Sequence, residues 1–254
     1  MLTFAMLVPS LHAGHAGSGS AMGGWQSPVS KDTNGQEWFS RLHVAEDSFV
    51  YSEYLRDRNL EVHPDVWVRR THIMDSLDAL PISFLYEPRC DQLLVTSDKG
   101  EEQPAYYFRY TDFEVVDNSE LIDWDITPIT EAQIGQWICA QGDIPDDRYD
   151  IWELSIADDR SFYLRLFLYD QVWLRNGWAL GFEIIGTYSV ENGDLLVNKA
   201  FKVQGDMLEE ITDEGIVPFV RDEVLALRYE EACDRLIVLL PTARDSRMVL
   251  RFQR

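Results

Sequence analysis

The chain has 254 residues, 46% of them hydrophobic and 12% aromatic, which suits a folded protein with one large or two small domains. Its 22 basic and 44 acidic residues give a formal net charge of −22. Nucleic acids and anionic membranes are bound through basic patches, so this charge argues against both kinds of partner. Solubility explains the acidity, with a basic partner or weak cation binding as the alternative.

Residues 1–22 have the pattern of a signal peptide followed by a short linker. The apolar stretch 2–11 precedes small residues at 13–20, as in the hydrophobic and cleavage regions of exported proteins. One element of the pattern is missing, because no Lys or Arg occurs before Lys31. We expect a periplasmic or secreted location, with an apolar tail on a cytosolic protein as the alternative. The apolar stretch is too short to cross a bilayer, and no transmembrane segment is expected.

Short runs of alternating apolar and polar residues predict that the chain is almost entirely β. Helix is expected only as one turn from Thr130, which has capping-box spacing with Gln133, and weakly at 207–213. In the first half, strands are expected at 38–44, 49–55, 66–73, 82–86, 92–96 and 106–110.

The second half predicts an antiparallel up-and-down β-barrel, because about eight short strands follow one another in sequence. Asn192-Gly193 is a tight-turn pair, as is Asn176-Gly177, and Gly181 and Gly186 are expected bulges or bends. The expected strands are 151–156, 161–168, 171–175, 178–190, 195–203, 224–229, 235–240 and 247–252.

Two blocks of sequence occur twice in the same order. Residues 86–95 match residues 229–238 at six of ten positions, with a constant offset of 143. Upstream, a second match has a constant offset of 112 and begins with Gly23 and Trp25, which return as Gly135 and Trp137. Solenoid repeats run to only ~20–50 residues. The spacing therefore indicates a duplicated domain.

The duplication divides the chain into a first repeat at 23–110, a linker at 111–134 and a second repeat at 135–254. Between the shared blocks the offset grows from 112 to 143, so the second repeat has about 30 extra residues, or two to three strands. The first repeat is then a reduced barrel, or a sheet that needs its partner.

Three cysteines occur, and Cys90 and Cys233 occupy the same place in the two repeats. They are either small buried hydrophobes inherited by duplication or a disulfide, which requires an oxidising compartment. Cys139 is then left over. No Cys/His group has zinc spacing, so no metal site is expected.

Each repeat opens with G-x-W, as Gly23-Gly24-Trp25 and Gly135-Gln136-Trp137, and each has an Arg in its last strand. This arrangement resembles the lipocalin-like (calycin) barrels. The resemblance implies two tandem barrels in which the Trp lies at the closed end and packs against the late Arg through a cation–π contact. The implied structural pairs are Trp25 with Arg109 and Trp137 with Arg251.

No catalytic constellation is present: the chain has no G-x-S-x-G, no HExxH and no phosphate-binding glycine loop. Acid pairs such as Asp146-Asp147 and Asp158-Asp159 lie in expected turns, where Asp is common. We therefore expect a non-enzymatic protein without a cofactor.

Two functional hypotheses remain. In the first, the second barrel binds a small apolar ligand. In the second, aromatic side chains fill the barrel, and the protein is a structural or protein-interaction domain of the cell envelope. An enclosed cavity would favour the first and a filled interior the second. The ligand-lining residues expected under the first hypothesis are Phe162, Phe167, Trp173, Trp178 and Phe182.

Overall fold

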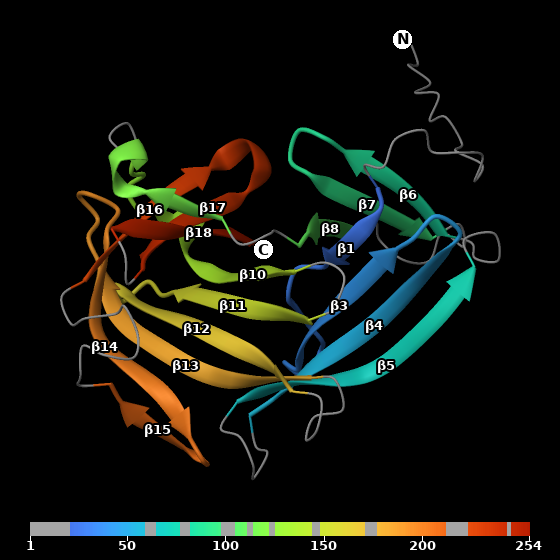
Figure 1. Ribbon diagram of the computed structural model, residues 1–254, viewed down its shortest axis with the longest axis horizontal. Helices are drawn as coiled ribbons and strands as arrows, with labels where there is room; N and C mark the ends of the chain where they lie inside the picture. Colours follow the sequence, from blue (N-terminus) through green and yellow to red (C-terminus); the bar gives the residue numbers. More distant parts are fainter. Residues whose placement is uncertain are drawn as a thin grey trace.

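Antiparallel β-strands, with three short 3-10 helices, make up the described part of the computed structural model (Figure 1). The all-β antiparallel fold expected from the alternating pattern is confirmed. The described residues are 21–58, 65–76, 82–97, 105–110, 114–121, 125–143, 148–170, 177–211, 223–242 and 245–254.

The C-terminal half forms a closed barrel of eight strands, because β14 pairs with β16 and the last strand, β18, pairs with β10. An additional strand, β15 (Met207–Glu210), forms a hairpin with β14 beside the ring, and η3 (Glu231–Cys233) links β16 to β17. The barrel strands are β10 (Gly135–Asp143), β11 (Arg148–Ile156), β12 (Ser161–Asp170), β13 (Gly177–Tyr188), β14 (Leu195–Gln204), β16 (Val224–Glu230), β17 (Arg235–Pro241) and β18 (Ser246–Gln253).

The N-terminal half forms an open sheet in the order β5-β4-β3-β1-β8-β7-β6, with β2 beside β3. Within the part of the chain that the structure describes, the two outer strands, β5 and β6, are not paired with each other. The strands are β1 (Gly23–Gln26), β2 (Ser30–Lys31), β3 (Glu37–Val44), β4 (Ser48–Asp57), β5 (Val66–Ser76), β6 (Ile82–Glu87), β7 (Gln92–Ser97) and β8 (Ala105–Arg109).

The segment between the two halves is partly structured. β9 (Val115–Asp117) pairs with β18, and η1 (Asn118–Leu121) follows it. The one-turn helix expected at Thr130 is confirmed as η2 (Glu131–Gln133), with Thr130 and Gln133 forming the capping box. The weak helix expectation at 207–213 is wrong, because this segment begins with strand β15, which follows a turn at Gly205.

Bulges occur where the two glycines of β13 were expected to cause them. Leu166 pairs with Phe182 and the next residue, Phe167, pairs with Leu180, so Gly181 is left without a partner in β12. The second irregularity lies at Gly186, where an added Cβ would come within 2.2 Å of both the Phe162 ring and the Leu196 carbonyl. Only glycine fits at that crossing.

The two halves pack through the outer wall of the barrel. The face of β3–β5 that points away from Trp25 covers β10–β13, and β5 pairs with β13 at Trp67 and Trp178 (Figure 1). The apolar part of this interface consists of Phe39, Tyr54, Trp67, Ile138, Ile151, Phe167, Trp178 and Leu180.

A buried ion-pair network lies in the same interface. Arg56 of the N-terminal sheet contacts Glu153 of the barrel at 2.5 Å, and each side chain is only 1% exposed. Arg56 also binds Asp65, and Glu153 is 3.5 Å from Arg165. Burial opposes the charge on Arg56, but the carboxylates of Glu153 and Asp65 raise the pKa of its guanidinium. The two halves are therefore joined by a fully paired charge as well as by apolar contact.

Replacing Glu153 with Ala leaves Arg56 buried with one carboxylate fewer, so we expect a loss of about 3–5 kcal/mol in the free energy of unfolding. The exposed pair Lys202–Glu209 is the matched control, because Glu209→Ala should cost less than about 1 kcal/mol. Urea denaturation measures both. Equal effects of the two substitutions would show that the Arg56–Glu153 pair does not stabilise the interface.

Candidate functional site

Among the described residues, the side chains that point into the C-terminal barrel pack against one another and are mostly buried. A residue with no accessible surface has no space beside it that could hold a water molecule, and interiors of this kind are packed as densely as organic crystals. The partly exposed side chains that pack against this core are Ile134, Phe182, Ile211, Tyr229 and Met248. The interior side chains with 0% exposure are Leu154, Phe162, Leu164, Ile184, Leu195, Val197, Leu225, Leu227, Leu236, Val238, Leu250 and Phe252.

The five aromatic residues expected to line a ligand cavity do not converge on one site. Phe162 and Phe182 point into the barrel, whereas Phe167 and Trp178 lie on the outer wall against the N-terminal sheet. Trp173 lies outside the described residues.

The reason for this separation is strand geometry. Phe162 and Phe167 are an odd number of residues apart in one strand, so alternation alone puts them on opposite faces. Trp178 and Phe182 are an even number apart, but the bulge at Gly181 reverses the face between them. The separation of Phe162 from Phe167 could have been predicted from the sequence. The separation of Trp178 from Phe182 required the position of the bulge.

The ends of the two halves that carry the G-x-W motifs, the G-x-W ends, have the same arrangement of Trp and Arg. The Arg109 guanidinium carbon lies 4.2 Å from the centre of the Trp25 ring, and its Nη1 donates to the Met22 carbonyl at 2.7 Å. In the barrel, Arg254 lies 4.4 Å from the Trp137 ring and donates to Ile134 O at 3.1 Å. Each Arg thus covers an indole face and satisfies a carbonyl just before the strand that carries the Trp.

The expected contact of Trp137 with Arg251 is wrong. Phe252 points into the barrel with 0% exposure, so Arg251 before it points outward, where its Nη1 lies 2.5 Å from Glu114. Arg254 follows the end of β18 and reaches back over Trp137.

Each G-x-W end also has a Tyr–Asp pair, which sequence reasoning did not identify. The Tyr86 hydroxyl donates to Asp91 at 2.9 Å, and the Tyr229 hydroxyl donates to Asp234 at the same distance. Burial, followed by this hydrogen bond, raises the pKa of both tyrosines. Asp91 and Asp234 in turn accept hydrogen bonds from the two capping arginines. The signal was available, because both pairs lie within the ten-residue match.

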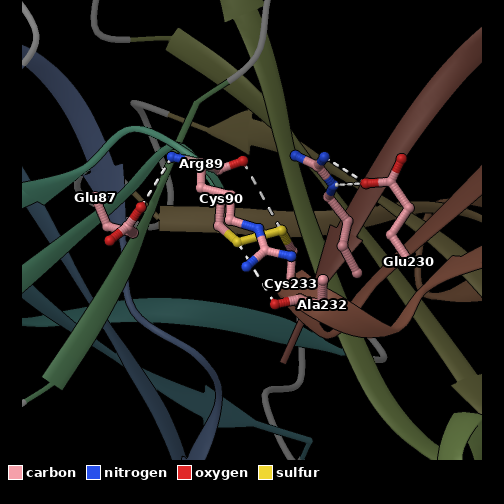
Figure 2. The surroundings of a disulfide bond; sticks show 7 residues. Glu87, Arg89, Cys90, Glu230, Ala232 and Cys233 are labelled. Carbon is pink, nitrogen blue, oxygen red and sulfur yellow. Dashed lines mark hydrogen bonds and ion pairs between the residues drawn. A yellow bond between two sulfur atoms is a disulfide. The ribbon is translucent and has the colours of Figure 1, made fainter.

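A disulfide joins Cys90 to Cys233, with their Cα atoms 5.4 Å apart (Figure 2). It links the turn between β6 and β7 to the turn between β16 and β17, so it ties the open sheet to the barrel. Cys139 takes no part in the disulfide and is buried in the barrel interior. The disulfide is therefore a covalent link between the halves, in addition to the ionic contact of Arg56 with Glu153.

The inner face of the N-terminal sheet, on the side of Trp25, is less completely covered than the barrel interior. Tyr51, Phe84 and Val95 pack against the core of this half but remain partly exposed, and Ile73 on β5 is 49% exposed. Polar groups also point to this face: the Tyr51 hydroxyl donates to Glu53 at 2.9 Å. Burial, and then the neighbouring Tyr107 and Glu53, raise the pKa of Tyr51. This face, the edge of β6 and the part of the β5 edge beyond its pairing with β13 at Val66 and Trp67 form the candidate site, as far as the described residues define it.

Among the described residues, no group of three or more His, Cys, Asp or Glu side chains could hold a metal ion. In the same part of the chain, no helix has the length and apolar character needed to cross a membrane.

Removing the disulfide by the double substitution Cys90→Ala and Cys233→Ala should lower the free energy of unfolding by about 2–5 kcal/mol, because the bond closes a long loop in the unfolded chain. Denaturation of the wild-type protein with and without a reductant is the control, since the substitutions should have no effect once a reductant is present. A loss that persists under reducing conditions would contradict this assignment.

Replacing Arg254 with Ala should cost about 1–3 kcal/mol, because it removes the cation–π contact and leaves Asp234 and two carbonyls without their donor. Arg251→Ala is the matched control and should cost less than about 1 kcal/mol, since its partner Glu114 is exposed. The reverse order of the two effects would restore Arg251 as the capping residue.

Neither a protein-family model nor a curated protein matches the chain. The functional interpretation therefore rests on the geometry of the chain itself.

Proposed function

We propose that the chain is an exported, non-enzymatic protein of two lipocalin-like repeats that acts as a protein-interaction domain of the cell envelope. In this proposal the C-terminal barrel is a filled scaffold and the N-terminal sheet is the binding half. The observation that carries it is the contrast between the two interiors: Ile184 of the barrel is 0% exposed, while Ile73 on the inner face of the open sheet is 49% exposed.

The repeated contacts support a duplication. Each G-x-W end combines a Trp, a Tyr, an Asp and an Arg in the same chain order, with similar Arg-to-Trp and Tyr-to-Asp distances. The bulge at Gly181 of β13, opposite Leu166 and Phe167, also has a counterpart at Arg70 of β5, opposite Glu53 and Tyr54. Bulges are specific features of a strand rather than defects, so a shared one favours common origin.

The disulfide supports export, because such bonds persist in oxidising compartments and are rare in the cytosol. The pattern of residues 1–22 points the same way. An exposed apolar pair on the outer face of the N-terminal sheet supports a protein partner: Leu85 is 52% exposed and Tyr106 is 50% exposed, and both pair with Leu94 across the strands.

A small ligand with an apolar body is the second candidate, and it would bind the inner face of the N-terminal sheet rather than the barrel. The observation in its favour is the Tyr51–Glu53 pair beside partly exposed apolar residues, since ligand sites combine apolar walls with a few polar groups.

Native mass spectrometry of the protein purified from its own host separates these candidates. The proposal predicts a complex with a second polypeptide that dissociates on activation. A constant added mass of small-molecule size would contradict it.

Binding of a hydrophobic fluorescent probe gives a further prediction. Because the barrel interior is packed, we expect no saturable probe site inside it with micromolar affinity, about −8 kcal/mol. Phe182→Asp, which places a carboxylate in that interior, should therefore leave probe binding unchanged. The matched variant is Ile73→Asp on the inner face of the N-terminal sheet, and both variants must remain folded by circular dichroism. A saturable site lost in Phe182→Asp but kept in Ile73→Asp would show that the barrel is a carrier after all.

A further inference from the structure

The N-terminal sheet and the barrel differ at one place in their strand order. In the barrel, β14 lies between β13 and β16 and pairs with both. In the N-terminal half, the corresponding strands are β5 and β6, and no described strand pairs with both of them. One strand is sufficient to close this position in the barrel.

Register identifies the residues that correspond in the two halves. Tyr51 pairs with Ile73 in the sheet, and Leu164, which occupies the place of Tyr51, pairs with Ile184 in the barrel. Ile73 therefore corresponds to Ile184. On the other side of the gap, the offset of 143 makes Ile82 the counterpart of Leu225.

The counterparts in the barrel are core residues that pair with β14. Ile184 pairs with Ala200, and Leu225 pairs with Leu195; Ile184 and Leu225 are both 0% exposed. In the sheet, Ile73 is 49% exposed and Ile82 is partly exposed. The apolar surface uncovered in the N-terminal half thus matches the surface that β14 covers in the barrel.

The edge on β6 also lacks the common protections of a free strand. Exposed edges are usually blocked by Lys, Pro or a bulge, because unpaired backbone groups are a template for another strand. β6 has the sequence ISFLYE, with neither Lys nor Pro, and it pairs regularly with β7 along its whole length. The edge is therefore open to strand addition.

We propose that an extended segment of a partner polypeptide adds an antiparallel strand between β5 and β6, at the position that β14 holds in the barrel. This inference rests on the proposed function and names the partner's form. Backbone hydrogen bonds to the two edges would supply affinity, and alternate side chains would supply specificity.

The barrel strand indicates what such a segment should look like. Leu195, Val197 and Ala200 of β14 point inward and are at most 5% exposed, whereas Asn198 and Lys199 point to solvent. A partner segment with small or aliphatic residues inward and basic residues outward would suit a protein with a net charge of −22.

The direct test uses a fluorescently labelled peptide with the sequence of residues 195–204 and the full-length protein. Fluorescence anisotropy should show binding of one peptide per chain. A peptide with Pro in place of Val197 and Ala200 should bind at least about tenfold more weakly, because Pro cannot donate to a strand ladder.

Protein variants locate the site. Ile73→Asp should weaken peptide binding by about tenfold or more, because it places a carboxylate under the added strand. Met207→Asp is the control, because Met207 is 73% exposed on β15, which has a described pairing with β14 only, and its substitution should leave peptide binding unchanged. Hydrogen exchange should show new protection in β5 and β6 when the peptide is bound.

Four results would overturn the inference. They are an absence of binding, protection confined to β15, a concentration-dependent dimer that buries β5 and β6, and binding that occurs only after residues 1–20 are removed. The third result would make a second copy the occupant, and the fourth would make it the chain's own N-terminal segment.

A graft gives an independent measurement. Replacing residues 77–81 with a copy of residues 189–223 supplies the missing strand within the chain, and it should abolish peptide binding while raising the unfolding midpoint. A folded graft that still binds the peptide with wild-type affinity would contradict the inference. If the graft does not fold, the comparison of Ile73→Asp with Met207→Asp tests the inference instead.

Failure of this inference and failure of the proposed function look different. A polypeptide partner in native mass spectrometry without peptide protection of β5 and β6 would reject strand addition alone. A bound small molecule in place of a polypeptide would reject the proposed function.

Discussion

Closure of the backbone hydrogen-bond ladder is the constraint on which the structure depends. Every strand has two edges, and their N–H and C=O groups must be paired, covered or solvated. The C-terminal half meets this requirement by closing into a ring of eight strands. In the N-terminal half no described strand joins β5 to β6, and the described residues form an open sheet.

The open sheet is supported from its convex side by the barrel. Its outer face packs on β10–β13 through Phe39, Tyr54 and Trp67, and Arg56 is held there by Glu153. The disulfide fixes the end of the sheet that carries β6 and β7. The barrel also pairs with the start of β5 at Val66 and Trp67, but it has no described pairing with residues 71–76 of β5 or with β6, where the added strand is proposed to bind.

Much of the fold could be predicted from the sequence because its signals are local. Alternation located most of the described strands, and Gly181 and Gly186 marked real bulges. It missed β1, β2, β9, β10 and β15, and the strand expected at 171–175 lies outside the described residues. The G-x-W motif correctly indicated that Trp25 and Trp137 are buried. The ten-residue match also contained Cys90 and Cys233, which the structure joins.

The remaining features depend on geometry that the sequence does not encode locally. The choice between Arg251 and Arg254 depends on which face of β18 each residue occupies and on how the chain turns after the strand ends. The burial of Trp178 in the interface could not be predicted, because an outward aromatic on one barrel looks like an inward one until the second half covers it. The pairing of Arg56 with Glu153 is likewise a contact between distant parts of the chain.

Native-state hydrogen exchange of the full-length protein, without any added partner, tests the central claim most directly. The amides of residues 71–76 in β5 correspond to residues 182–187 in β13, which β14 protects. If the N-terminal half is an incomplete barrel, the β5 amides that are not bonded to β4 should exchange orders of magnitude faster than their β13 counterparts. Equal protection in the two strands would show that the position beside β5 is already filled. It would contradict the claim that the N-terminal half is an incomplete barrel.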